Sequence, residues 1–485
     1  MIASIETLKC LCSGSDRGLV ERNVDQVLTG LMFGVSQDKE ETVVTGLQAL
    51  LECLDCTAAN FARKEERNYL MTVICNLTQS SSDQVNSLAL ECLNKIVSLF
   101  YPLMEEYMAV ALIPISLKAL QSRQEMTVMQ AIEFWSNICQ CELSLPDDSL
   151  KELLGEGSVS LVNSLHRIMM ELDRSELDME QWTKLTAATG CLSQLCQCLG
   201  SPVTEPSLQF ISLNIRSHNW RQRHAAIISI STLLDMEDRG SLASVLASFL
   251  SMASSFLRDD NPSIRTAASY VLLQVSDRAA DVVISSQTSA TVLGLASVCL
   301  QAQDPRLTEH GCLVTSNLLQ SRPQLNTEED LRYIEPLLQH LLSVTDVDFL
   351  TANSSSSSLR QLAFSALSDI VDHCSHQHLQ TQILKKYIPG LLERFHRLLS
   401  PETSSWLHVD ISFNCSILNS ILLGLERETV LSLAPDILPL ISKMFDLQQL
   451  HEDAILILRA LVDQLGNDPH VSVVMKCINS LTVRL

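Results

Sequence analysis

Apolar residues recur along this chain at helical spacing. One run comprises Ile264, Ala267, Ala268, Val271, Leu272 and Val275, and a second comprises Ala454, Ile457, Leu458, Leu461, Val462 and Leu465. Steps of three and one place such residues on one face of an α-helix. One helix pair cannot bury this stripe alone, so neighbouring pairs have to stack. The pattern therefore predicts an all-α chain of stacked helix pairs.

Four segments share one pattern and indicate a repeat. Each opens with a turn, places an arginine near the expected helix start and continues with small and aliphatic residues: NWRQRHAAIISISTLL, NPSIRTAASYVLLQV, DPRLTEHGCLVTSNLL and SSLRQLAFSALSDIV. Aligning Arg223, Arg265, Arg306 and Arg360 gives intervals of 42, 41 and 54 residues. The last interval is longer because it contains a polar loop, expected at 345–358. Two-helix HEAT units span about 40–47 residues. We therefore predict one right-handed α-solenoid of HEAT repeats, an armadillo-like superhelix, over residues 1–485.

Composition narrows the possible functions. The formal net charge is −22 and the isoelectric point is about 4.9. Such an acidic surface disfavours nucleic acid and anionic membranes as partners, and it favours basic proteins. The longest weakly polar run, LASVLASFLSMASSFL, is too short and too rich in serine to span a bilayer. We therefore expect no nucleic-acid binding and no membrane insertion.

The 16 cysteines suggest metal or redox chemistry at first sight. Close spacings occur at Cys53 with Cys56, Cys139 with Cys141, and the group Cys191, Cys196 and Cys198. A structural zinc site needs four converging ligands, and residues 53 and 139 lie about two repeats apart. Buried, reduced thiols are the better interpretation. No phosphate-binding glycine loop or nucleophile elbow is visible in the sequence, so we expect no metal, no cofactor and no enzymatic activity.

Several segments resemble importin β, the karyopherin family that carries cargo through nuclear pores. The best matches are AIEFWSNICQCE at residues 131–142 and the preceding NLTQSSSDQVNSLALECLNKIVSLFYPLMEEYMAVAL. TAANFARKEERNYLMTVIC is similar to the fifth and sixth repeats of the family, NWRQRHAAI to the ninth, and LHEDAILILRALVDQLG to one past the middle. The resemblance is colinear over nearly the whole chain. It implies a match to about the fourth to fourteenth repeats, without the family's first three repeats or its C-terminal third.

The resemblance implies that phenylalanine-glycine (FG) repeats of nucleoporins bind the convex face, between outer helices of adjacent repeats. The matching positions are Leu28, Thr29, Met32, Glu66, Tyr69, Leu70, Tyr107 and Ile115. A flexible methionine and aliphatic walls accept an aromatic ring, and one ring buries too little area for tight binding. Many weak sites would then give avidity with rapid exchange. Ordinary packing between helices is the alternative, since all these residues also fall at helical spacing.

On the concave face, the resemblance implies a site for the basic helix of importin α or for another basic cargo. The matching positions are Glu133, Trp182 and Tyr270. A carboxylate beside an aromatic ring offers an ion pair and a cation–π contact to arginine or lysine. Trp135 is expected to pack between helices, and a solvated Glu133 is the alternative interpretation. Val314 and Tyr270 stand where the family has tryptophans, and Gln140 stands where it has an aspartate, which weakens the case for the usual importin-α helix.

A third surface is the acidic loop at 171–182, ELDRSELDMEQW. In the family this place holds consecutive acidic residues that contact the GTPase Ran. Here Leu177 and Met179 interrupt Glu176, Asp178 and Glu180, which dilutes the charge. A solvated loop is an equal alternative to a Ran contact, and the family's main Ran site lies in repeats that the match does not include.

These features together predict a nuclear import receptor that acts as a monomer. The expected location is the cytoplasm and nucleus, including the nuclear envelope at pores. Two alternatives stay open: a HEAT scaffold or regulatory subunit of another complex, such as a phosphatase or a coat, and an enzyme. Binding to FG peptides would separate the receptor from the scaffold. A single pocket in which carboxylates or histidines with strongly shifted pKa values converge would favour the enzyme.

Overall fold

The fold is seen in a computed structural model. It describes residues 2–13, 17–144, 151–171, 183–236, 238–285, 287–302, 304–321, 328–345, 356–375, 383–399 and 408–465. These residues form helices joined by short turns and loops, without a β-strand. The predicted all-α fold is therefore confirmed. Contacts divide the chain into two compact units, Met1–Leu242 with Asn261–Ala267 and Ala243–Asp260 with Ala268–Leu485.

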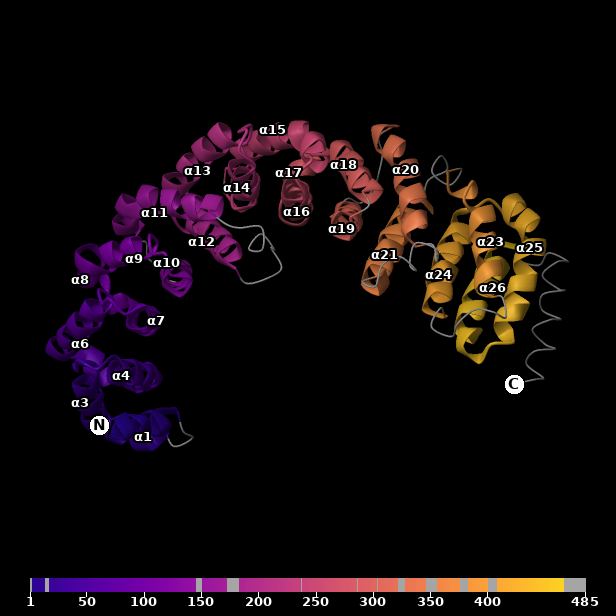
Figure 1. The fold of residues 1–485 in the computed structure, drawn as a ribbon. Helices are drawn as coiled ribbons and strands as arrows, with labels where there is room; N and C mark the ends of the chain where they lie inside the picture. Colours follow the sequence, from indigo (N-terminus) through magenta and orange to yellow (C-terminus); the bar gives the residue numbers. More distant parts are fainter. Residues whose placement is uncertain are drawn as a thin grey trace. The chain divides into compact units, whose positions relative to one another are not determined.

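Unit 1 contains two rows of helices (Figure 1). The row that we call inner comprises α1 (Ile2–Ser13), α4 (Glu40–Cys53), α7 (Asp83–Phe100), α10 (Glu125–Ser144), α12 (Lys184–Leu199) and α14 (Trp220–Ser231). The outer row comprises α3 (Val24–Val35), α6 (Lys64–Leu77), α9 (Ile113–Ala119), α11 (Lys151–Glu171) and α13 (Ser201–Asn214). Each inner helix contacts the next inner helix, and each outer helix packs on an inner one. This is the stacking that the apolar stripes require.

Short helices fill the turns of unit 1. They are α2 (Arg17–Arg22), η1 (Leu54–Cys56), α5 (Ala58–Ala62), η2 (Tyr101–Leu103), α8 (Glu105–Tyr107) and the π-helix η3 (Met108–Leu112). The segments Asp83–Leu103 and Glu105–Ala119 form a bent pair of helices at 119°, which by length and composition alone could cross a membrane. No single helix in the described ranges is long and apolar enough to cross a membrane.

Unit 2 repeats the same pairing. Its helices are α17 (Ala280–Ser285), α18 (Ser289–Gln301), α19 (Pro305–Ser321), α20 (Glu328–Val344), α21 (Ser356–Ser375), α23 (Ile388–Leu398), α24 (His408–Gly424), α25 (Arg427–Phe445), η7 (Gln448–Leu450) and α26 (His451–Leu465). Helices α15 (Arg239–Leu257) and α16 (Pro262–Arg278) fall at the boundary between the units. The row α19, α21, α24 and α26 is continuous by contact, and α18, α20, α23 and α25 pack on its successive members. The predicted HEAT-like pairs are therefore present in both units.

Local sequence sets where several inner helices begin. Ser82 accepts a hydrogen bond from the Val85 amide at the start of α7, and Asn219 accepts one from the Arg221 amide at the start of α14. The side chains of Thr183 and Thr186 form a reciprocal capping box before α12. These groups satisfy backbone donors that have no partner within a helix. The predicted apolar stripes are buried as expected. All six residues of the stripe between Ile264 and Val275 are buried, and in the stripe on α26 only Val462 is partly exposed.

Buried charges add specific links between neighbouring helices. In unit 2, Arg360 of α21 pairs with Asp410 of α24, and burial raises the pKa of that carboxyl despite the nearby guanidinium. In unit 1, the buried guanidinium of Arg67 donates to the Phe61 carbonyl at 2.6 Å and to Glu106 at 2.8 Å. Hydrogen bonds from Arg67 and Lys64 lower the pKa of Glu106 to about 2. Removing one partner of such a pair would leave the other charge uncompensated.

Two glycines allow the first helices of unit 1 to approach closely. A Cβ atom at Gly34 of α3 would lie 2.5 Å from Ile5 Cδ1 of α1, and one at Gly46 of α4 would lie 2.9 Å from Val35 Cγ1 of α3. Both distances are too short for carbon atoms in contact. Gly46 also lies near the backbone of α3, with Val35 N at 3.3 Å, so the spacing of α3 and α4 depends on the absence of a side chain there.

Three histidines are buried and hold their neutral form. They are His166 in α11, His224 in α14 and His310 in α19. His166 stacks on Phe210 with a ring-centroid distance of 3.9 Å. Burial lowers the pKa of each of the three to about 4, from an ordinary value of 6.5. Below pH 6.5 the unfolded chain therefore binds protons that the folded chain does not, and stability falls as the pH falls.

Because of this linkage, we expect the protein to lose stability at pH values well above the pKa of ordinary carboxyl groups. The free energy of unfolding should fall by roughly 2 kcal/mol for each histidine when the pH is lowered from 7 to 5. His166→Phe keeps a ring on Phe210 and removes the titrating group, so the denaturation midpoint should depend less on pH. Chemical denaturation at the two pH values measures this. His218→Gln, on the surface, is the control, and an equal pH dependence in wild type and His166→Phe would contradict the prediction.

Candidate functional site

A groove of about 710 Å³ lies between the outer helices α3 and α6 of unit 1, with α5 at one end. Its lining comprises Asp25, Leu28, Thr29, Met32, Phe33, Ser36, Asn60, Arg63, Glu65, Glu66, Tyr69 and Leu70. Leu28, Thr29, Met32, Glu66, Tyr69 and Leu70 are positions that the family resemblance assigns to FG binding. The structure therefore brings these six together in one cavity, although they come from helices about 40 residues apart.

The groove has an apolar floor and aromatic walls. Leu28, Met32 and Leu70 are buried and form the floor, which agrees with their helical spacing on α3 and α6. Phe33 and Tyr69 are 63% and 55% exposed and stand at the mouth. An exposed aromatic pair beside buried aliphatic side chains is suited to an aromatic ring from a ligand. The packing alternative also holds for the floor residues, because they contribute to the core as well.

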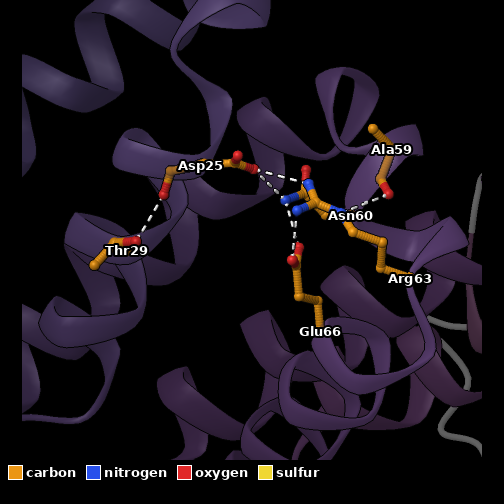
Figure 2. A network of polar contacts seen from close by, with 6 residues as sticks. All are labelled: Asp25, Thr29, Ala59, Asn60, Arg63 and Glu66. Atoms are coloured by element: carbon orange, nitrogen blue, oxygen red, sulfur yellow. Dashed lines mark hydrogen bonds and ion pairs between the residues drawn. The ribbon is translucent and has the colours of Figure 1, made fainter.

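One end of the groove is closed by a polar network that joins α3, α5 and α6 (Figure 2). Asn60 is 2% exposed, and its Nδ2 donates to Asp25 Oδ1 at 2.7 Å and to Glu66 Oε2 at 2.8 Å. Arg63 pairs with the same two carboxylates, at 3.0 Å and 2.6 Å. Hydrogen bonds from Asn60 and Arg63 lower the pKa of Asp25. The network fixes the carboxylates of two neighbouring outer helices on one amide and one guanidinium.

Sequence reasoning included Glu66 but missed Asp25, Asn60 and Arg63 of this network, and it also missed Phe33. Asn60 lies on α5, a five-residue helix in the turn before α6, and its partners lie 35 and 6 residues away. No periodicity connects such positions. Phe33 could have been found, because it follows Met32 on the face that already carries Leu28 and Thr29.

Tyr107 and Ile115 do not line the groove. Both are half-buried, in α8 and α9. The Tyr107 hydroxyl donates to Asn68 Oδ1 of α6 and accepts from Arg67 Nε at 3.3 Å. Tyr107 thus links α8 to α6, which is a packing role. Nucleoporin binding at these two positions stays a prediction.

Acidic residues align on the inner row of unit 1. Glu133 of α10 is exposed, which fits both a binding role and a solvated side chain. Glu52 of α4 and Glu91 of α7 occupy the preceding inner helices. Desolvation and the nearby charges of Glu133 and Glu52 raise the pKa of Glu91. Glu91 thus lies close enough to Glu52 and to Glu133 to feel their charge, and the three carboxylates would attract a basic ligand. Glu52 and Glu91 were missed, although Glu52 lies 39 residues before Glu91 and Glu91 lies 42 residues before Glu133, each close to one repeat.

The remaining predicted residues have varied positions. Trp135 is buried, which agrees with the expected packing between helices, and it meets its chain neighbour Phe134 edge to face at 5.8 Å. In unit 2, Tyr270 is half-buried and meets His310 edge to face at 6.4 Å. The sequence predictions at Trp182, Glu176, Asp178 and Glu180 lie outside the described residues, as does 346–355 of the polar loop.

Among the described residues, the cysteines show no arrangement suited to metal. Cys53 neighbours Cys12, and Cys139 neighbours Cys198, each across two inner helices. Burial raises the pKa of the Cys191 and Cys299 thiols to about 12, so they stay protonated. Within the described ranges no group of three or more His, Cys, Asp or Glu side chains could hold a metal ion.

Comparisons with known proteins agree with the resemblance seen in the sequence. No family model matches the chain. It is 25% identical over 366 residues to importin subunit beta-1 of Schizosaccharomyces pombe, covering 71% of this chain and 42% of the relative. It is 25% identical over 424 residues to importin subunit beta-1 of Arabidopsis thaliana, covering 83% and 48%. The chain thus spans about half the length of these curated relatives.

Solved structures of importin β have the same fold. Importin β from an ammonium sulfate condition matches with a TM-score of 0.78 and 20% identity, covering 96% of this chain and 56% of that one. A complex of Kap95 with Nup1 matches with a TM-score of 0.74 and 22% identity, covering 96% and 55%. A structure of Kap95p with RanGDP matches with a TM-score of 0.75 and 21% identity, covering 91% and 52%. At these identities the structures establish the fold.

The polar network predicts that Asn60 holds α5 against the outer helices. Asn60→Ala removes the donor that two carboxylates share and leaves them to Arg63 alone. Amide hydrogen exchange in α5 and the first turn of α6 should become about tenfold faster, because a hydrogen bond to a charged group contributes roughly 1.5–3 kcal/mol before solvent screening. Mass spectrometry measures the exchange. Ser36→Ala is the control, since Ser36 Oγ donates only to the Met32 carbonyl of its own helix. Equal amide exchange rates in α5 and the first turn of α6 for the two variants would contradict the prediction.

Proposed function

We propose that this chain, which belongs with the importin β family by sequence similarity and by fold, acts in nuclear import and binds nucleoporin FG repeats through the groove between α3 and α6. The observation that carries the proposal is the lining of that groove. Six positions assigned by the resemblance meet there, and the cavity has an apolar floor with exposed aromatic walls. The fold alone would not support transport, since stacked helix pairs serve many functions.

Binding at the groove would be weak and reversible. A phenylalanine ring that enters the groove removes apolar area from water and gains about 1.5–3 kcal/mol. Ordering a flexible peptide offsets part of this gain. One groove therefore gives low affinity and fast exchange, and useful retention at a pore requires several contacts at once. This behaviour is what a carrier in transit needs.

The second proposed surface is the acidic inner row, for a basic cargo or an adaptor such as importin α. Glu52, Glu91 and Glu133 lie on three successive inner helices. Each exposed carboxylate contributes little alone, but a row of them matches an arginine-rich or lysine-rich helix and accelerates its encounter. The resemblance implies an aromatic contact from Trp182 to the same ligand, and a separate one from Tyr270 of unit 2. The interaction would be non-covalent and would not involve catalysis.

The partners of neighbouring structures support this proposal. Kap95 forms a complex with Nup1, and a further structure contains Kap95p with RanGDP. We infer that this chain likewise meets nucleoporins and basic proteins while moving between cytoplasm and nucleus, as a monomer. A contact with Ran through the acidic loop at 171–182 belongs to the same proposal. A HEAT scaffold outside the pore is the competing function, and binding to FG peptides decides between them.

The groove proposal predicts that its two exposed aromatic walls control peptide binding. Phe33→Ala combined with Tyr69→Ala should weaken binding to an FG peptide about tenfold, because each aromatic contact contributes roughly 0.5–1.5 kcal/mol. Both side chains are more than half exposed, so the fold should be unaffected. Surface-immobilised peptide, with a phenylalanine-to-serine version as reference, measures the affinity.

Leu213→Ala is the matched control for this experiment. Leu213 is 72% exposed on the outer helix α13, away from the groove. The control should bind the peptide as the wild type does. Undiminished binding by the Phe33 and Tyr69 double variant, or no binding by the wild type, would remove the groove from the mechanism and favour the scaffold.

The inner row predicts binding that depends on charge and pH. Glu91→Gln with Glu133→Gln should weaken a basic helical peptide about tenfold at low salt, and the difference should shrink at high salt as screening increases. Because the pKa of Glu91 is raised, wild-type binding should also weaken on acidification before ordinary glutamates are protonated. Titration followed by fluorescence anisotropy measures both effects. Glu40→Gln with Glu65→Gln changes the net charge equally at other sites, and an equal loss there would count against a specific row.

A further inference from the structure

We infer that the groove between α3 and α6 distinguishes FG peptides by the charge beside their phenylalanine, and that it prefers a lysine or an arginine two residues from the ring. This inference rests on the proposed function, because it takes the groove as the place where the ring binds. It adds a rule for choosing among such peptides, which the apolar floor alone does not supply. The rule follows from the carboxylates at one end of the groove.

This end of the groove carries three carboxylates and one guanidinium. Asp25, Glu65 and Glu66 line it together with Arg63. Arg63 pairs with both Asp25 and Glu66, so a single positive charge is divided between two negative ones (Figure 2). The side chain of Glu65 is exposed and forms no ion pair or hydrogen bond with any described residue. Three negative charges and one positive charge leave a net charge of −2 at this end.

The same end has more hydrogen-bond acceptors than donors. Asn60 is 2% exposed, and its Nδ2 donates to two carboxylates. Its Oδ1 is also buried but has no hydrogen-bond partner among the described residues, which is unfavourable for a carbonyl group. The carboxylates of Asp25 and Glu66 keep lone pairs beyond those that Asn60 and Arg63 occupy. A ligand group that only donates, such as an ammonium or a guanidinium, complements this end, whereas a carboxylate or a phosphate does not.

The separation between floor and carboxylates sets the position of the cation in the peptide. Asp25 precedes the floor residue Leu28 by three positions, and Glu66 precedes Leu70 by four. On a helix these steps correspond to roughly one turn, or about 5.4 Å. In an extended peptide, side chains two residues apart point to the same side and are separated by about 6.6 Å. A cation two residues from the phenylalanine therefore reaches the carboxylates while the ring lies on the floor.

This local preference differs from the general attraction of an acidic protein for cations. The chain has a formal net charge of −22, so any basic peptide gains from the overall field. That gain depends on the net charge of the peptide and little on the position of the lysine. An ion pair in the groove depends on the position. Peptides with equal charge and a displaced lysine therefore isolate the contribution of the groove.

Fluorescence anisotropy of FG peptides with the full chain, at low and at high salt, tests this inference. One peptide has a lysine two residues before the phenylalanine, a second has it two residues after, and a third has it about six residues away. A fourth has no lysine, and a fifth has a glutamate at the nearby position. We expect the better of the two nearby-lysine peptides to bind about threefold tighter than the distant-lysine peptide, which is typical of an exposed ion pair. The glutamate peptide should bind most weakly, and the differences should shrink at high salt.

Glu65→Lys tests the contribution of the carboxylates directly. The substitution leaves this end of the groove without a net charge and removes no contact between described residues, so the thermal midpoint should be unchanged. The preference for a nearby lysine should disappear. Glu205→Lys is the matched control, because Glu205 is exposed on the outer helix α13 and its replacement changes the net charge equally. This control should keep the threefold preference.

The outcomes distinguish this inference from the proposed function. If the peptide without lysine binds and its phenylalanine-to-serine version does not, the groove binds the ring whatever the charge beside it. Equal binding of the nearby-lysine and distant-lysine peptides, or the same preference in Glu65→Lys and Glu205→Lys, would then overturn the charge rule alone. Absence of binding by every peptide would overturn both. A preference that Glu65→Lys loses and Glu205→Lys keeps assigns the rule to this groove.

Discussion

The burial of one apolar stripe per helix controls everything else in this protein. No helix pair can hide its stripe alone, so each inner helix packs on the next, and each outer helix packs on the inner row. The side chains used for packing are then unavailable to ligands. What remains for binding is the space between adjacent outer helices and the polar face of the inner row. The groove at Leu28, Met32 and Leu70 arises in this way, since its floor is the edge of the core.

Much of the fold could be predicted from the sequence, and less of the site. Helical periodicity at Ile264–Val275 identified buried positions correctly, because burial follows the local pattern. The spacing of Arg223, Arg265 and Arg306 gave the size of the pair. The groove residues came from the family resemblance, since periodicity alone favoured packing for them. Asn60, Arg63 and Asp25 were missed, because their contacts depend on how two helices dock and no local rule encodes that.

Charge is distributed unevenly over the two rows. The inner row of unit 1 gathers Glu52, Glu91 and Glu133, whereas Arg123 and Arg167 line one cavity where the outer helices α9 and α11 end. The row of carboxylates costs self-repulsion in the free protein, which a basic ligand would relieve. The net charge of the chain does not show this uneven distribution.

The contact between Gly46 and Val35 has a mechanical consequence. With no Cβ between them, α3 and α4 rest backbone against side chain, and the joint tolerates little sliding. A single methyl group there would act as a wedge. Each helix pair of unit 1 packs on the pair before it. A change in the packing angle between α3 and α4 would therefore shift every later pair of that unit. Evolution can alter the distant surfaces of such an array through one glycine, without touching a residue that meets a ligand.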